Sequence, residues 1–254
     1  MLDLNHASGA VYGGVAPSNI GDEINARINL ALVIRNAEQK RRAYIQASRI
    51  GESCARMVQY EYMQTPYDPD REFDGYTIRI FDRGHKGEVI VADWLRMAGY
   101  NLRTARNNGQ QFGFSSLGGK FSGHIDGVII GSSAPSSLGF PCLWEHKTVG
   151  AKSWNAIVKN GVQKAKPVYY GQVSIYQAYM ELTDHSALFT ALNADTQELW
   201  CEPVPFDAAT AQSLSDRAVQ IAKATEAGEM LPRVASNPSW WECKWCNFAA
   251  RCWS

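Results

Sequence analysis

The sequence GHIDGVII at residues 123–130 and the sequence LWEHKTV at residues 143–149 both have the pattern of a β-strand. Between them, residues 131–140 are rich in glycine, serine and proline, which favours a turn. The simplest connection is an antiparallel hairpin. If its loop is centred near Pro135 and Ser136, Asp126 lies opposite Glu145, and the two-residue period of a strand places Lys147 on the face of Glu145.

Two carboxylates directly opposite each other on neighbouring strands repel, so Asp126 and Glu145 do not stabilise the hairpin by themselves. A divalent cation removes this repulsion, because Mg²⁺ prefers carboxylate oxygens, and it can activate a water for attack on phosphorus. Lys147 could orient that water or offset negative charge in the transition state. An isolated Glu-x-Lys is also common on ordinary surface hairpins, so the prediction depends on its context.

The totals place the chain among globular proteins. With 254 residues and 45% hydrophobic content it can bury a sizeable core. We predict an N-terminal arm at residues 1–20 and one domain over residues 21–254. Lys plus Arg and Asp plus Glu are both 25, so a nucleic-acid surface would have to come from local clustering of charge.

Apolar periodicity predicts helices over residues 22–45, 54–62, 84–97, 151–158, 167–182 and 208–227. Extended segments dominate residues 101–149, and a second hairpin is expected over residues 188–192 and 198–204. This order predicts an α/β fold with a mixed central β-sheet flanked by helices.

The sequence contains neither a leader pattern near its start nor an apolar run of about 18 residues, so we expect no membrane segment. A reducing, cytoplasmic location, in a bacterial or phage-infected cell, is the resulting expectation. There the six cysteines are expected to be thiols or metal ligands.

The Gly-x-Ile-Asp strand ending at Asp126, followed by the Glu145-x-Lys147 strand, resembles the RecB-like branch of the PD-(D/E)XK nuclease superfamily. The resemblance covers about residues 50–254 and implies a restriction-endonuclease-like core, Mg²⁺ or Mn²⁺ as cofactor, and DNA as substrate. Ile125 stands where the superfamily's name has proline, as it commonly does in this branch.

The resemblance also implies further site residues. Family members carry a His or Glu metal ligand on a helix before the sheet, and His85 and Glu88 match it; the Arg83-Gly84 pair favours Glu88 as in phage exonucleases, with His85 as second choice. Taken alone, Glu88 also suits an ordinary helix N-terminus. Gln172 and Tyr176 match the family's Gln-x-x-x-Tyr motif, which helps to position the DNA strand and the active site.

Cys243, Cys246 and Cys252 give the spacing C-x2-C-x5-C, which needs a fourth ligand to complete a tetrahedral or cluster site. The segment around Cys54 resembles the first-cysteine segment of the CRISPR-associated and AddB-type iron–sulfur exonucleases. This resemblance implies a 4Fe–4S cluster that joins the two ends of the nuclease domain, and zinc is the alternative because C-x2-C serves both metals.

The expected function is therefore a metal-dependent DNA exonuclease of phage or recombination DNA processing. A structure-specific endonuclease and a non-catalytic nucleic-acid-binding or assembly module are the alternatives. Besides DNA, a single-strand annealing or recombination protein fits as a partner.

Overall fold

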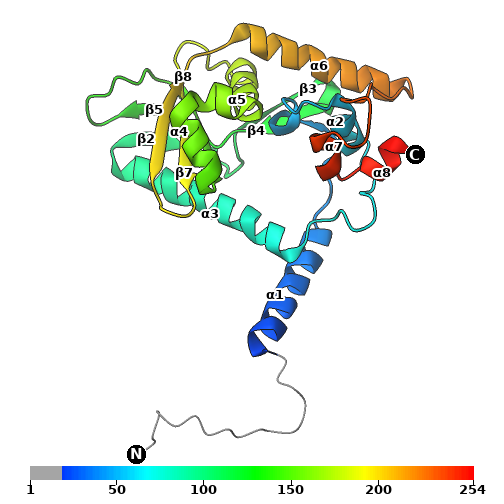
Figure 1. Cartoon of the computed structure of the whole chain (residues 1–254). Helices are drawn as coiled ribbons and strands as arrows, with labels where there is room; N and C mark the ends of the chain where they lie inside the picture. Colours follow the sequence, from blue (N-terminus) through cyan, green and yellow to red (C-terminus); the bar gives the residue numbers. More distant parts are fainter. Residues whose placement is uncertain (1–18) are drawn as a thin grey trace, which may run out of the picture. The chain divides into compact units, whose positions relative to one another are not determined.

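The computed structural model describes residues 19–254, so the predicted arm at residues 1–20 lies outside the described residues except for its last two (Figure 1). The chain forms two compact units. One comprises the described residues up to Gln39 together with Phe73–Arg79, and the other comprises Lys40–Glu72 and Ile80–Ser254. Each is described by itself.

The helices are α1 (Ile20–Ala37), α2 (Ala55–Tyr62), α3 (Gly75–Met97), α4 (Ala151–Ala165), α5 (Pro167–Tyr179), α6 (Ala208–Glu226), α7 (Trp241–Trp245) and α8 (Ala249–Trp253), with short 3-10 turns η1 (Ala47–Arg49) and η2 (Leu117–Gly119). The strands are β1 (Ile45–Gln46), β2 (Tyr100–Arg103), β3 (Gly113–Ser116), β4 (Phe121–His124), β5 (Gly127–Ser132), β6 (Cys142–Val149), β7 (Ala187–Asn193) and β8 (Leu199–Val204).

Two mixed sheets form the framework of the larger unit. A five-stranded sheet has the order β2-β5-β6-β7-β8, with β6 and β7 parallel and the other pairs antiparallel. A three-stranded sheet has the order β1-β4-β3. The predicted α/β fold with mixed strands and flanking helices is confirmed, although the single predicted sheet is divided into two.

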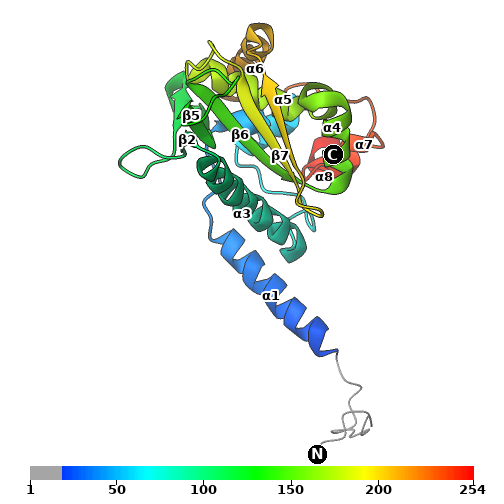
Figure 2. The same ribbon diagram turned by 90° about the vertical axis from the view of Figure 1, so that its left-hand side faces the viewer.

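Strand β6 lies between β5 and β7 in the five-stranded sheet (Figure 2), and most of its side chains are buried, on both faces of the sheet. Leu143 packs in the core that includes α4, α5 and α6, whereas Trp144 packs in a second core with Val91 and Leu95 of α3. Because side chains alternate along a strand, Glu145 and Lys147 face the same side as Leu143, and His146 faces the side of α3.

Two predicted helices are present, but one boundary of each was predicted wrongly. The helix predicted over residues 22–45 ends at Ala37, and Ile45 instead pairs with Phe121 in a parallel β-bridge and is 1% exposed. Burial of Ile45 in the core outweighs the helical periodicity of the segment. The helix predicted to begin at Gly84 begins at Gly75, preceded by Asp74, whose carboxylate accepts the backbone N–H of Thr77 at 2.7 Å.

The two predicted hairpins are confirmed: β5 pairs with β6, and β7 pairs with β8, antiparallel in both cases. No helix within residues 19–254 has the length and apolar character needed to span a bilayer.

Candidate active site

Asp126 lies at a bend between two sheets. Strand β4 ends at His124 and β5 begins at Gly127, so the segment predicted as one strand passes from the three-stranded sheet to the five-stranded sheet at this carboxylate. Gly127 is paired with Trp144, which puts Asp126 beside Glu145 on the neighbouring strand, as the sequence predicts. The backbone N–H of His146 donates to Asp126 Oδ2 at 2.8 Å and fixes the carboxylate.

Glu145 is fully buried, with 0% exposure. Its Oε1 accepts a hydrogen bond from Lys147 Nζ at 2.5 Å, while its Oε2 has no hydrogen-bond partner among the described residues. Burial, and then the charge of Asp126, raise the pKa of Glu145 to about 8. Since a buried polar atom without a partner costs about 1–3 kcal/mol, an unsatisfied carboxylate oxygen beside a second carboxylate fits a role in binding a cation.

Lys147 is held from two sides. Burial by itself lowers the pKa of this ammonium, but Glu145 and Asp126 overcome that effect and raise it. The Nζ atom also lies 5.4 Å from the ring centroid of Tyr169 on α5, a cation–π distance. Lys147 is therefore a charged, positioned group at neutral pH.

Glu88 comes to the same place from α3. Burial, followed by repulsion from Asp126, raises the pKa of Glu88 to about 7, whereas Lys147 acts in the opposite direction. His85 precedes Glu88 by three residues and its charge acts on Asp126, so both predicted α3 residues lie near the hairpin carboxylates. Because α3 begins at Gly75, Glu88 is in the middle of the helix, and a helix N-terminus does not explain it.

Gly87 allows α3 to approach β6. A Cβ atom at this position would lie 2.0 Å from Thr148 Oγ1, well inside van der Waals contact. Glycine in the middle of a helix lowers stability by about 1 kcal/mol relative to alanine. The close packing of α3 against β6 has to compensate for this loss.

We expect Gly87→Ala to move α3 away from β6 and to shift Glu88 from the hairpin carboxylates. The DNA cleavage that the sequence predicts should fall by at least about tenfold, the scale on which small displacements of positioned groups act. Gly84→Ala, one turn earlier and with nothing within 4 Å of the added Cβ, is the matched control and should retain activity. Equal activity of both variants would show that this approach does not position Glu88.

Gln172 and Tyr176 lie on α5 and are 5% and 2% exposed. Burial, followed by the charge of Glu145, raises the pKa of Tyr176, whereas the side chain of Gln172 acts on this pKa in the opposite direction. Gly123 makes room for the Tyr176 ring, because a Cβ there would lie 2.6 Å from Cε1. In this arrangement the pair supports the site from inside the protein.

The opposite face of β6 carries a polar network that the sequence analysis missed. Thr190 Oγ1 accepts a hydrogen bond from Trp144 Nε1 at 3.0 Å and lies 3.0 Å from His146 Nδ1, and His146 Nε2 lies 3.1 Å from Thr148 Oγ1. Burial, and then the charge of Lys147, lower the pKa of His146 to about 3, so the imidazole is neutral. This network fixes the strand that carries Glu145 and Lys147.

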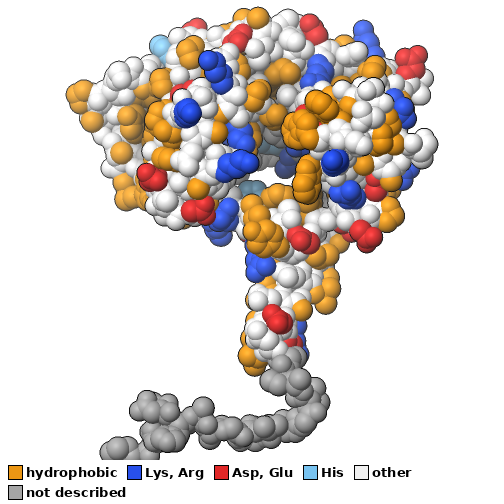
Figure 3. Space-filling view, in the orientation of Figure 1, with side chains coloured by type: hydrophobic (Ala, Val, Ile, Leu, Met, Phe, Trp, Pro, Cys, Tyr) orange, Lys and Arg blue, Asp and Glu red, His pale blue; other side chains and the backbone are white. Residues whose placement is uncertain are grey.

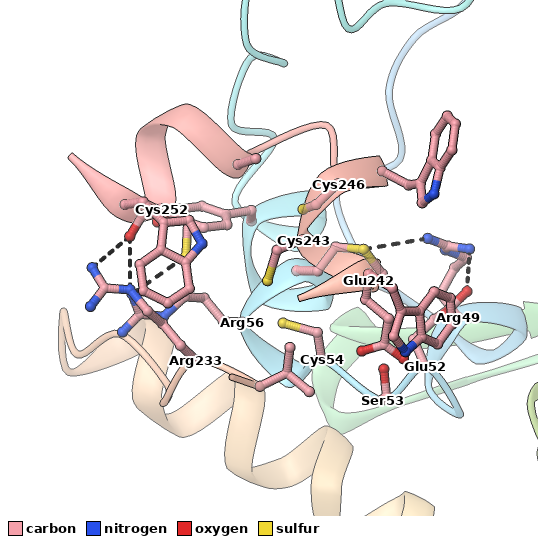
Figure 4. Close-up of a pocket in the computed structure, with 17 residues that line it drawn as sticks. Arg49, Glu52, Ser53, Cys54, Arg56, Arg233, Glu242, Cys243, Cys246 and Cys252 are labelled. Carbon is pink, nitrogen blue, oxygen red and sulfur yellow. Dashed lines mark hydrogen bonds and ion pairs between the residues drawn. The ribbon is translucent and has the colours of Figure 1, made fainter. Parts of the chain in front are cut away.

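The four predicted cluster cysteines line one pocket of about 210 Å³ (Figure 4). Cys54 precedes α2, Cys243 lies in α7, Cys246 follows α7, and Cys252 lies in α8. Burial raises the pKa of Cys54, and raises that of Cys246 to about 11, with the neighbouring thiols adding to both shifts. Arg56 Nη1 lies 3.8 Å from Cys252 Sγ. Cys142 and Cys201 are not among the residues that line this pocket.

Within residues 19–254, no group of three or more His, Cys, Asp and Glu side chains is arranged to hold a metal ion. The carboxylates form one group and the cysteines form another, and neither group has a completed coordination geometry. The unsatisfied Glu145 oxygen and the gathering of four cysteines around one pocket are the observations that fit metal groups at these two places.

Comparison with solved structures finds the alkaline exonuclease LHK-Exo of Laribacter hongkongensis, at 15% identity and a TM-score of 0.51, over 74% of this chain and 90% of that chain. LHK-Exo in complex with dAMP matches at 15% identity and a TM-score of 0.47, over 80% and 93% of the two chains. SSO0001 matches at 16% identity and a TM-score of 0.49, over 89% and 95%. No family model and no curated protein matches the sequence. The chain therefore shares, at the level of fold, a distant similarity with an alkaline exonuclease.

Proposed function

We propose that this protein is a divalent-metal-dependent DNA exonuclease with a PD-(D/E)XK active site. The observation that carries the proposal is the fully buried Glu145, which has one oxygen on Lys147 and the other unsatisfied, beside Asp126. An ion pair with a purely structural role would need only Glu145 and Lys147. It would not need the additional carboxylates of Asp126 and Glu88. The exonuclease fold of the similar structure agrees with this assignment.

Asp126, Glu145 and Glu88 would hold Mg²⁺ or Mn²⁺, with His85 as the alternative to Glu88. When bound, such a cation polarises the scissile phosphate and lowers the pKa of a coordinated water. Lys147 contributes a fixed positive charge next to these carboxylates, where negative charge develops on phosphorus. His146 keeps Asp126 oriented through its backbone N–H, and Tyr169 holds the Lys147 ammonium on its ring.

The distribution of charge is compatible with a DNA backbone even though the net charge is zero. Figure 3 shows several Lys and Arg side chains on the displayed face of the described chain. Local cations of this kind position phosphates without reading sequence.

Four cysteines around one pocket support a 4Fe–4S cluster as the second cofactor. Cys54, Cys243, Cys246 and Cys252 line this pocket, and four cysteine thiolates are the ligands of a 4Fe–4S cluster. Four thiolates also hold zinc, which is therefore the alternative. The resemblance of the Cys54 segment to the iron–sulfur exonucleases favours the cluster.

The function is tested by cleavage of end-labelled linear DNA and of covalently closed circular DNA with Mg²⁺, Mn²⁺ or EDTA. We expect metal-dependent release of nucleotides from linear DNA only, and no release by the Asp126→Asn variant. Cleavage of the closed circle would make the protein an endonuclease. No cleavage of either DNA in any metal would overturn the enzyme assignment in favour of a binding module.

A further inference from the structure

Three tryptophans near the end of the described chain are exposed to solvent. Trp240, Trp241 and Trp245 are 45%, 62% and 79% exposed. Indole rings usually bury most of their surface, and exposed apolar groups that gather on one surface mark a binding site. None of the proposed catalytic chemistry requires these rings.

Trp241 and Trp245 are the first and last residues of α7. Residues four apart lie on the same face of a helix and about 6 Å apart along its axis. Both rings also line the rim of the cysteine pocket, together with Trp253. Helix α7 therefore carries two exposed indole side chains, one turn apart.

The charged residues in the last segment of the sequence are mostly positive. Over residues 232–254 the basic residues are Arg233, Lys244 and Arg251, and Glu242 is the one acidic residue. Lys244 and Arg251 are exposed, and no ion pair joins either of them to another residue of the described chain. Arg233 lies over the Trp253 ring, with Cζ 4.6 Å from the centroid.

Exposed aromatic faces interleaved with cations are the chemistry that binds an unpaired nucleic-acid strand. Bases stack on the rings whatever their sequence, and the cations follow the phosphates. A purely apolar protein partner would leave Lys244 and Arg251 without a counter-charge. The combination therefore favours a single strand over an apolar protein surface.

We infer that Trp241 and Trp245, with Lys244 and Arg251 beside them, form a stacking platform for single-stranded DNA next to the cysteine pocket. The inference rests on the proposed function and extends it, since it assigns a place for the unpaired strand outside the carboxylate site. Duplex DNA gains nothing from the rings because its bases are already stacked on each other.

The test measures binding of labelled single-stranded and double-stranded oligonucleotides by fluorescence anisotropy, with the full chain carrying Asp126→Asn so that no cleavage occurs. We expect Trp241→Ala and Trp245→Ala each to weaken single-strand binding by about 5- to 150-fold, the range for loss of one stacked base, and to leave duplex binding within about twofold. Trp245→Phe should retain most of the affinity and Trp245→Leu should lose it, because leucine is apolar without a π face. Tyr76→Ala, at an aromatic residue of 61% exposure in the other unit, is the matched control.

Unchanged single-strand affinity in both alanine variants would overturn the platform, and so would Trp245→Leu binding as well as Trp245→Phe. The second result would assign the surface to an apolar partner. Binding is measured in a variant that does not cleave DNA, so a failed binding test would leave the nuclease proposal intact. Conversely, a protein without nuclease activity could still bind single-stranded DNA at the two tryptophans.

Discussion

Lys147→Met is expected to lower the rate of DNA cleavage about 10²–10³-fold, the loss seen when one preorganised electrostatic group is removed from a transition state. Methionine keeps the length of the side chain and removes its charge. The ammonium is bound to Glu145 and placed over Tyr169, so its position is already fixed before a substrate arrives. Single-turnover cleavage at saturating Mg²⁺ measures the effect on the chemical step.

The same substitution leaves Glu145 buried without a partner, which costs roughly 3 kcal/mol of stability in a broken buried ion pair. Protonation of Glu145 limits this cost, because its pKa is already raised by burial. The double variant Glu145→Gln/Lys147→Met removes both charges, and it should unfold at a temperature close to that of the wild type while remaining inactive. A double variant that regains both stability and activity would contradict a catalytic role for the pair.

The geometry of the hairpin follows from the sequence because two local rules determine it. A turn centred near Pro135 fixes the register, and a strand alternates its side chains, so Asp126, Glu145 and Lys147 meet without any knowledge of distant contacts. The approach of Glu88 could not be derived in this way. It depends on the contact of Gly87 with Thr148, which joins segments far apart in the sequence.

The residues that hold His146 and Lys147 in place were not predicted, because they also come from segments far away in the sequence. Thr190 reaches His146 from β7, and Tyr169 reaches Lys147 from α5, across connections that have no sequence signal of their own. The end of α1 was misplaced because Ile45 is recruited into a parallel bridge with Phe121, and a helical period cannot reveal a partner about seventy-five residues away.

The end of the chain is attached to α2 and its neighbourhood by contacts that need no metal. Asp68 accepts the backbone N–H groups of Ala250 and Arg251 at 2.6 and 3.3 Å, which supports the start of α8. Phe248 is 1% exposed and packs on Tyr60, with ring centroids 5.1 Å apart. Loss of a cluster should therefore loosen this end of the chain without releasing it completely.

Cys54→Ser is expected to abolish iron binding and to lower stability by at least about 4 kcal/mol, the chain-entropy value for a constraint that closes more than 100 residues. For a chain of this size that corresponds to a fall in Tm of roughly 10 °C. The protein as purified should carry iron and a broad visible absorption band, and Cys54→Ser should be colourless and more readily cleaved by protease after α6.

Cys201→Ser is the matched control, because Cys201 is exposed on β8 and does not line the pocket. A colourless wild-type protein that contains stoichiometric zinc would overturn the iron–sulfur proposal and assign a zinc ion to these cysteines. Equal Tm values for Cys54→Ser and Cys201→Ser would show that the Asp68 and Phe248 contacts alone hold this end of the chain. The nuclease assignment would survive either result, because Asp126, Glu145 and Lys147 are positioned by the hairpin and not by the cysteines.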